Sequence, residues 1–529
     1  MKFVPLAKFA AVTAALAISF SVAAGAQTLR TFNGGEPASL DPHRVSGDWE
    51  NRLVGDYLEG LMTEDANATP ILGQAASFTI SEDGLVYTFV LRDDAMWSDG
   101  TPVTAGDFDY AFRRLFEPER AAEYAYLQYP IKNAEAINGG EMPMDQLGVR
   151  VVDDRTIEFT LEQPTPYFID ALTHYTAYPV PQHVVEQFGD DWIRPENIVG
   201  NGPYQVVEWI PNSYIRSVRS ETYYDAANVQ IAEVYYYALD DISAALQRYR
   251  AGEFDILTDF PTDQYQLLQN QYPGQAHVAP FLGIYYYVMN QNMPELQDVN
   301  VRQALSMAVN RDIIGPQILG TGELPAYGWV PPGTANYPFP GFEPDWVALP
   351  YEERVAQATA LMEAAGYTAQ NPLNLQLRYN TNDNHQRIAV AISAMWEPLH
   401  VNVELFNAEV AVHYDALQAN DFAGVGRAGW LMDYNDAINT LELLRSDIIY
   451  NYGRFNNPEF DALLRQSATI TDMAARGEIL RQAEVLAMEN YAALPLYYYV
   501  SKNVVSPRVQ GFVDNAKDIH RTRWLSLTN

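Results

Sequence analysis

Residues 424–434 read GVGRAGWLMDY, and this stretch decides between a dinucleotide-binding fold and a fold with a glycine-rich strand. Its first six letters match the G-x-G-x-x-G pattern of a dinucleotide-binding loop, which must leave a strand and open a helix. Here the glycines run directly into the aromatic, strand-like segment that begins at Trp430, and Asp447 further along does not supply the missing helix. We therefore predict a glycine-rich strand that lets another segment of backbone approach closely.

Asp433 follows this predicted strand, directly after three large apolar side chains. A carboxylate in such surroundings is costly to bury alone, and an ammonium group would offset that cost. The same carboxylate could instead pair with Arg427 as a structural bridge. Residue types alone leave both interpretations open.

The whole chain has 529 residues, of which 48% are hydrophobic and none is cysteine. This length predicts two or three domains with a large core. The lack of cysteine excludes a disulfide scaffold, a cysteine-ligated metal site and a thiol enzyme. Lys and Arg number 33 against 67 Asp and Glu, a net charge of -34, so nucleic acid is a poor partner.

The first 26 residues have the pattern of a secretory signal peptide. Lys2 and Lys8 flank the start of an apolar stretch from Phe9 to Val22, and residues 24–26, Ala-Gly-Ala, resemble a cleavage site. A membrane anchor is the alternative, but the apolar stretch is shorter than the roughly 20 residues that a bilayer span needs. We predict a periplasmic protein, secreted through this signal peptide.

Strand and helix patterns alternate along the rest of the chain. Two hairpins are predicted at residues 78–91 and 149–161, and Thr104 is expected to cap a helix that runs through Leu115. A further strand pair opens at residue 204, and a strand at 235–238 precedes a helix at 244–249. Later helices are predicted at 301–309, 351–365, 384–396, 458–468 and 474–490. The fold class is therefore α/β.

The common catalytic and metal-binding motifs do not occur in the chain. It has no G-x-S-x-G elbow, no H-E-x-x-H and no Walker loop, and its eight histidines never pair on one helix turn. Tyrosines, by contrast, cluster at 124–129, 235–237, 285–287 and 497–499. Such rings suit a cleft that hydrogen-bonds a backbone, although half of each triplet is expected in the core. We expect a binding protein rather than an enzyme, with no cofactor and no metal.

Six ordered motifs resemble those of the oligopeptide-binding proteins of bacterial ABC importers, within the peptide/nickel solute-binding family. They are GEPASLDPH (35–43), WSDGTPVTA (97–105), NGPY (201–204), YRAGE (249–253), VRQAL (301–305) and RAGWLMDYN (427–435). The resemblance covers essentially the whole chain after the predicted signal peptide. It implies a two-lobed periplasmic-binding-protein clamshell with an extra inserted domain.

The resemblance also implies the domain limits. Lobe I would consist of residues 27–58, 182–284 and 501–529, the inserted domain of 59–181, and lobe II of 285–500. Two crossovers, at 281–287 and 497–502, would form the hinge, and their tyrosines would line the cleft.

The ligand-binding residues that the resemblance implies lie mostly in the last motif. Asp433 would hold the α-ammonium of a peptide, with Trp430 and Tyr434 flanking it and Gly429 allowing close approach. Tyr124 matches a family tyrosine of the inserted domain.

Other implied site residues lie on the hinge and near the far end of the peptide. Tyr286 matches a tyrosine on one hinge strand, and Tyr498 lies on the other. Arg427 and His385 match positions that hold the terminal carboxylate of particular peptide lengths. Two departures stand out, because Val410 replaces a tryptophan beside one side-chain pocket and a second basic residue is missing around Gln418.

These implications predict a receptor that captures short peptides and delivers them to an inner-membrane ABC permease with cytoplasmic ATPase subunits, acting as a monomer. The same fold could serve another solute, such as a murein peptide, an opine or a metal complex. An extracellular peptidase and a peptide-binding chaperone are alternatives from other classes. Asp433 argues against ligands that lack a free amine.

Overall fold

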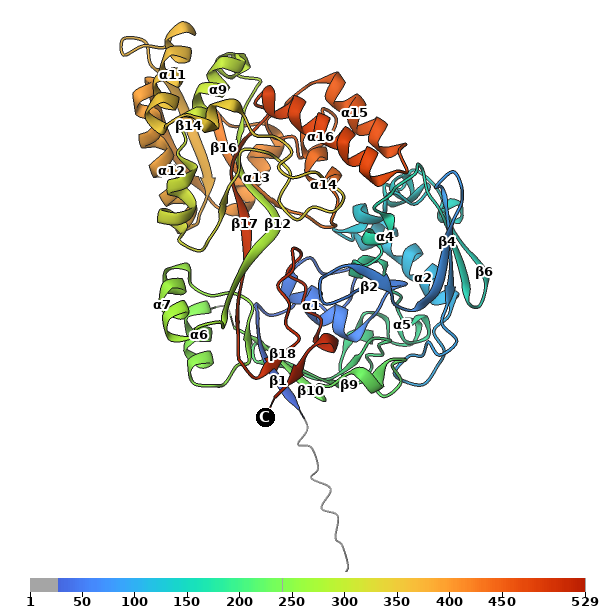
Figure 1. Cartoon of the computed structure of the whole chain (residues 1–529). Helices are drawn as coiled ribbons and strands as arrows, with labels where there is room; N and C mark the ends of the chain where they lie inside the picture. Colours follow the sequence, from blue (N-terminus) through green and yellow to red (C-terminus); the bar gives the residue numbers. More distant parts are fainter. Residues whose placement is uncertain (1–26, 240, 529) are drawn as a thin grey trace, which may run out of the picture.

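The computed structural model describes residues 27–239 and 241–528 (Figure 1). The predicted signal peptide, residues 1–26, lies outside this range. Among the described residues, none of the helices combines the length and apolar character required to cross a membrane. The same residues contain no cluster of three or more His, Asp or Glu side chains that could hold a metal ion.

One large mixed sheet runs through the whole molecule. In spatial order its strands are β15 (Val401–Ala408), β14 (Leu373–Asn380), β16 (Gly424–Leu431), β12 (Ala276–Met289), β17 (Leu494–Val505), β11 (Ile256–Leu257), β1 (Thr28–Gly34), β10 (Glu233–Ala238), β9 (Tyr214–Arg219) and β8 (Tyr204–Ile210), with β13 (Leu324–Pro325) paired to β17.

The long strands β12 and β17 connect the two halves of this sheet (Figure 1). Their upper parts pair with β16 and β13, whereas Val504 and Val505 at the end of β17 pair with β11 in the lower half. The predicted crossovers, residues 281–287 and 497–502, lie on these two strands.

The tyrosines of β12 and β17 divide between two hydrophobic clusters. Tyr285, Tyr287 and Tyr497 belong to one cluster, whereas Tyr286 and Tyr498 belong to another. This division follows from strand geometry, because successive side chains point to opposite faces of a sheet. The position of each tyrosine in its triplet therefore decides on which face of the sheet its side chain lies.

The predicted hairpins form a separate four-stranded sheet, in the order β4 (Ala75–Ile80), β5 (Val86–Leu91), β7 (Thr156–Thr160) and β6 (Val149–Asp153). Helix α2 (Ala105–Leu115) packs against it and begins after Thr104, as predicted. The Asp107 carboxylate accepts a hydrogen bond from the Thr104 backbone N–H at 2.8 Å, which stabilises the helix start.

The upper half carries the later helices close to their predicted limits. They are α9 (Val299–Met307), α11 (Tyr351–Ala364), α12 (Asp383–Trp396), α15 (Pro458–Ala468) and α16 (Met473–Glu489). In the lower half, α6 (Ile242–Arg250) follows β10 as predicted.

Residues 424–431 form strand β16, which confirms the strand prediction for the glycine-rich stretch. Gly424 shows why glycine is required there. Its φ of +130° is one that L side chains rarely adopt, and a Cβ would lie 2.5 Å from the Gln376 carbonyl oxygen of β14. The glycine therefore lets the neighbouring backbone approach, and the stretch is not a nucleotide-binding loop.

Candidate ligand-binding site

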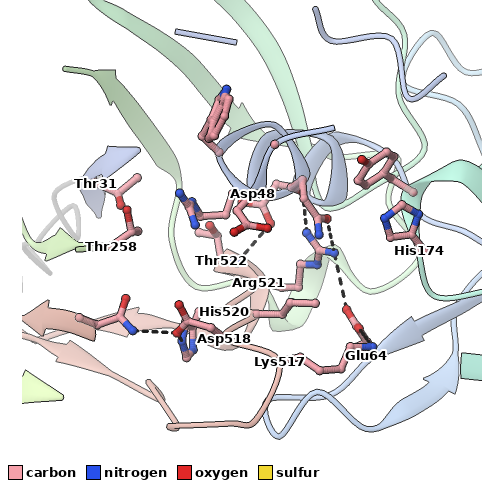
Figure 2. A pocket seen from close by; sticks show the side chains of 18 of the residues that line it. Thr31, Asp48, Glu64, His174, Thr258, Lys517, Asp518, His520, Arg521 and Thr522 are labelled. Carbon is pink, nitrogen blue, oxygen red and sulfur yellow. Dashed lines mark hydrogen bonds and ion pairs between the residues drawn. The ribbon is translucent and has the colours of Figure 1, made fainter. Parts of the chain in front are cut away.

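A cavity of about 370 Å³ lies at the end of β16, and its walls come from both halves of the molecule. Leu431, Met432 and Asp433 form one wall. Helix α1 (Asp48–Tyr57) and the C-terminal segment contribute others, and Figure 2 shows Asp48 and Arg521 from these elements.

The Asp433 carboxylate faces this cavity and has no cationic partner among the described residues. Its Oδ2 accepts hydrogen bonds from the Tyr126 hydroxyl at 3.2 Å and from the Asn439 side-chain amide at 3.3 Å. Burial raises the pKa of Asp433 to about 6, against the lowering effect of these two hydrogen bonds. The carboxylate is therefore ionised at neutral pH and can accept a cation.

Trp430 acts on Asp433 through Asn439 rather than by direct contact. Its indole N–H donates to the Asn439 side-chain oxygen at 2.8 Å, and its ring packs 5.2 Å from that of Tyr450. Because the Asn439 oxygen is occupied in this way, its amide nitrogen is turned to Asp433. Asn439 lies in the short helix α14 (Ile438–Leu441), which positions it.

Two further predicted residues lie near Asp433. Tyr124 lines the same cavity, and its ring stacks on His174 with 5.6 Å between ring centroids. Tyr434 is buried and stacks on Tyr167, with centroids 4.5 Å apart and planes inclined by 5°. Tyr434 therefore packs on the side of this segment away from the cavity and does not line the cavity.

Arg427 occupies a second polar cluster, further back along β16. Its guanidinium donates to the hydroxyls of Tyr414 at 2.8 Å and Tyr499 at 3.0 Å, and to the Asn380 side-chain oxygen at 3.3 Å. It also lies 4.7 Å from the ring centroid of Tyr285. Arg427 is only 8% exposed, and all these partners are neutral. A buried cation with neutral partners would gain from an anionic group.

His385 and Gly429 complete this second cluster. The His385 Nδ1 lies 3.3 Å from the Tyr285 hydroxyl. Burial, with a contribution from Arg427, lowers the pKa of His385 to about 3, so this imidazole is neutral at pH 7. At Gly429, a Cβ would lie 2.6 Å from the Tyr499 hydroxyl, so glycine leaves room for the bond between Tyr499 and Arg427.

The structure does not form the alternative bridge between Asp433 and Arg427. Within residues 27–239 and 241–528, the Arg427 guanidinium has tyrosine and asparagine partners, and the Asp433 carboxylate has Tyr126 and Asn439. The Asp433 carboxylate and the Arg427 guanidinium can therefore each pair with a different charged group of a ligand.

Two predicted residues are placed away from both clusters. Tyr286 is 2% exposed and packs against the Trp329 ring at 4.6 Å, and Tyr498 is buried in the same hydrophobic cluster. Tyr285 and Tyr499 take the face of Arg427 instead, because side chains alternate across a strand. Tyr286 and Tyr498 therefore lie on the face of each strand opposite to Arg427, and their role in ligand binding stays a prediction.

Six residues that contact Asp433, His385 or Arg427 could not be singled out from the sequence. They are Tyr126, Tyr285, Asn380, Tyr414, Asn439 and Tyr499. Tyr126, Tyr285 and Tyr499 belong to the tyrosine clusters of the sequence, but the face of a strand on which a tyrosine lies cannot be chosen without the register of that strand.

Comparison with known proteins gives one family. The model of the bacterial extracellular solute-binding proteins, family 5 Middle, matches residues 69–451. The periplasmic oligopeptide-binding protein OppA of Escherichia coli (strain K12) is 39% identical over 490 residues, which cover 92% of this chain and 90% of OppA.

Two solved structures extend this similarity to the fold. The unliganded open form of MppA, a periplasmic murein tripeptide binding protein, matches with a TM-score of 0.84 at 37% identity, covering 95% of this chain and 98% of that one. Haemophilus influenzae OppA in complex with RPPGFSPFR matches with a TM-score of 0.78 at 34% identity, covering 95% and 99%.

Proposed function

The chain belongs to the bacterial extracellular solute-binding proteins of family 5, and from this membership we propose that it is the peptide-binding receptor of an ABC importer. Short peptides would be captured between the lobes and delivered to an inner-membrane permease with cytoplasmic ATPase subunits. The family is one of solute-binding receptors, so the chain would bind its ligand without transforming it. Residues 1–26 would direct it to the periplasm, where it would act as a monomer.

The observation that carries the proposal is the Asp433 carboxylate, which faces the cavity without a cationic partner in the described chain. A peptide α-ammonium placed there would form a charge-assisted hydrogen bond, a strong kind of polar contact. The hydrogen bonds from Tyr126 and Asn439 would fix the carboxylate for this contact.

The second cluster would receive the other end of the peptide. Arg427 is a buried guanidinium among neutral partners, so a terminal carboxylate that reaches it would offset the cost of its burial. His385 would add a neutral hydrogen-bonding group beside it. Peptides of different lengths would therefore share the Asp433 contact and differ in the contact with Arg427.

The proposed lobes follow the division predicted from the resemblance, with lobe I at 27–58, 182–284 and 501–529, the inserted domain at 59–181 and lobe II at 285–500. The paths of β12 and β17 between the two halves of the sheet support this division. Separate hydrophobic clusters in the two halves support the boundary of lobe II, whereas proposed lobe I and the inserted domain share one cluster. Ligand contacts from both lobes would favour a closed form.

Thermal unfolding of the refolded mature protein tests the proposal. Refolding removes any ligand carried through purification, and the protein is then heated with mixed peptides of two to six residues or with the same pool N-acetylated. A ligand at about 100 times its dissociation constant adds roughly 2.7 kcal/mol of apparent stability. We expect only the free-amine pool to raise the midpoint.

The variant Asp433→Asn is the matched control, because it keeps the shape of the side chain and removes its charge. It should lose the response to the free-amine pool. A midpoint that neither pool raises in the wild type would contradict the peptide-receptor proposal. Mass spectrometry of whatever co-purifies, with murein peptides as the first reference compounds, would then identify the ligand.

A further inference from the structure

Three consecutive residues after β16 each contact a different side chain of the proposed inserted domain. The Asp433 carboxylate accepts from the Tyr126 hydroxyl, and the Tyr434 ring stacks on Tyr167. The backbone N–H of the third residue, Asn435, donates to Oδ2 of Asp170. We call residues 433–435 the ligand loop.

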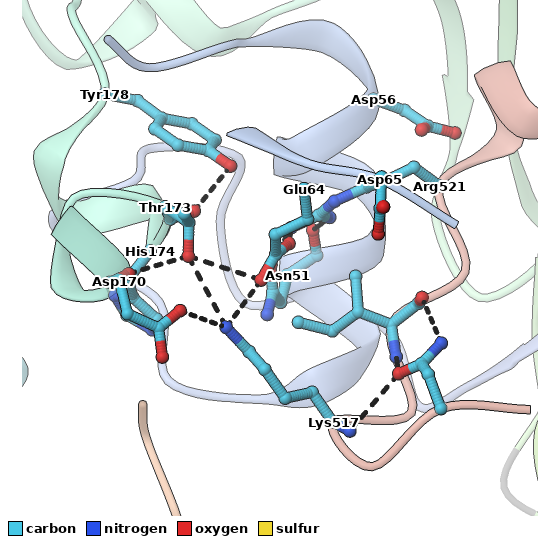
Figure 3. Close-up of polar contacts among 12 residues, drawn as sticks. Asn51, Asp56, Glu64, Asp65, Asp170, Thr173, His174, Tyr178, Lys517 and Arg521 are labelled. Carbon is cyan, nitrogen blue, oxygen red and sulfur yellow. Dashed lines mark hydrogen bonds and ion pairs between the residues drawn. The ribbon is translucent and has the colours of Figure 1, made fainter. Parts of the chain in front are cut away.

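Asp170 also has a second partner on a third segment of the chain. Its Oδ1 accepts from the Lys517 ammonium at 3.0 Å, while Oδ2 bonds the ligand loop. Figure 3 shows the Lys517 side chain reaching toward Asp170 and Glu64. One carboxylate therefore joins the C-terminal segment of proposed lobe I to the loop that carries Asp433.

Lys517 is a firm anchor for this bridge. It also pairs with Glu64 at 2.7 Å, and the three side chains of Lys517, Asp170 and Glu64 are 6%, 11% and 1% exposed. Burial alone would lower the pKa of Lys517, but the carboxylates of Asp170 and Glu64 outweigh burial and hold it above its usual value. Arg521 pairs with Glu64 in turn, at 3.5 Å, and donates to Asn51 on helix α1.

We infer that Asp170 is a positioning residue that orients Asp433 for its ligand by tying the ligand loop to the buried Lys517. The inference rests on the proposed function, in which Asp433 holds the α-ammonium. A binding group that is fixed before the ligand arrives loses less conformational freedom on binding, and affinity rises accordingly. Asp170 itself does not line the cavity and acts on the ligand only through the loop.

The test compares affinities for paired ligands that differ in one group. Alanine peptides of two to six residues are measured beside analogues in which propionyl replaces the first alanine, which removes only the α-amino group. Isothermal titration calorimetry gives the ratio of the two dissociation constants for each protein. We call this ratio the amine selectivity. It reports on Asp433, and a general loss of folded protein leaves it unchanged because both measurements are affected alike.

For Asp170→Asn, we expect the affinity for free-amine peptides to fall about tenfold, because the loop that carries Asp433 would lose one of its fixed contacts and would have to be ordered on binding. The affinity for the propionyl analogues should stay unchanged, so the selectivity falls by the same factor. In an Asp433→Asn background, Asp170→Asn should have no further effect, because residues that act through one contact are not additive.

The matched control is Asp41→Asn. Asp41 forms an even more deeply buried ion pair with Arg114, and it contacts neither the ligand loop nor the cavity. It should lower the unfolding midpoint without changing the amine selectivity. If Asp170→Asn does not fold, Tyr167→Leu removes the neighbouring contact with the ligand loop and should lower the selectivity in the same direction.

Wild-type selectivity in Asp170→Asn, or an equal loss of affinity for both ligands, would overturn the inference while leaving the proposed function intact. A wild-type protein that binds neither ligand at any length would overturn the proposed function, and the inference with it.

Discussion

Burial of Asp433 disfavours the ionised carboxylate, whereas its proposed role requires that ionised form. Burial raises its pKa to about 6, and only the ionised carboxylate can pair with an ammonium group. The folded protein without ligand therefore takes up a proton at Asp433 as the pH falls through about 6. In the proposed role of Asp433, that proton would have to leave before an α-ammonium could pair with the carboxylate.

From this pKa we predict that the affinity for free-amine peptides is highest near pH 7 and falls below about pH 6, approaching tenfold per pH unit, as Asp433 takes up a proton. It should also fall above about pH 8, where the α-amino group of the peptide loses its proton. Calorimetry across this range measures it. Asp433→Asn should show weak binding without this pH dependence. Glu442, whose pKa burial raises to about 7, also titrates in this range, so a decline that persists in Asp433→Asn would assign the effect to Glu442 instead.

At the scale of elements, strands β12 and β17 decide which tyrosines lie on the same face as Arg427. The motif around β16 predicts Asp433, Arg427 and Gly429 as ligand-binding residues from the sequence, because they lie at fixed places in a recognisable run, and their role stays a prediction. Tyrosine triplets carry no such reference, since every residue is the same and a shift of one reverses the face. Tyr285 and Tyr499 therefore emerged only from the structure, as did Asn439, which lies on a separate short helix.

Adjacent tyrosines on β17 give a matched pair of variants for this division. Tyr499→Phe removes the hydroxyl that accepts from Arg427 at 3.0 Å, whereas Tyr498→Phe removes one on the opposite face. We predict that Tyr499→Phe weakens binding about ten- to hundredfold for peptides whose carboxylate reaches Arg427, the worth of one hydrogen bond to a charged group. Tyr498→Phe should bind as the wild type does. Equal losses in both variants would contradict the assignment of faces.

At the scale of the whole molecule, the two sides of the cleft differ in how they are joined. Near α4 (Phe168–Ala171) and α14, the ligand loop is bonded to Asp170, and Asp170 is bonded to Lys517 (Figure 1). On the other side of Figure 1, α12 lies in the upper half and α7 (Tyr265–Gln271) lies below it in the lower half. A molecule already tied on one side closes mainly by movement on the other.

We therefore predict that peptide binding shortens the distance between α7 and α12 and leaves the distance across the tied side unchanged. The chain has no cysteine, so pairs of introduced cysteines can be spin-labelled without background. Double electron–electron resonance would compare Gln266→Cys with Gln386→Cys, both on exposed helical surface, and Gln163→Cys with Gln466→Cys across the tied side. Shortening of both distances would mean that the lobes close as rigid bodies about β12 and β17, and that the bridge through Asp170 opens or moves with them. Adding Asp170→Asn to the second pair separates these cases, because release of the bridge should broaden its distance distribution before any peptide is added.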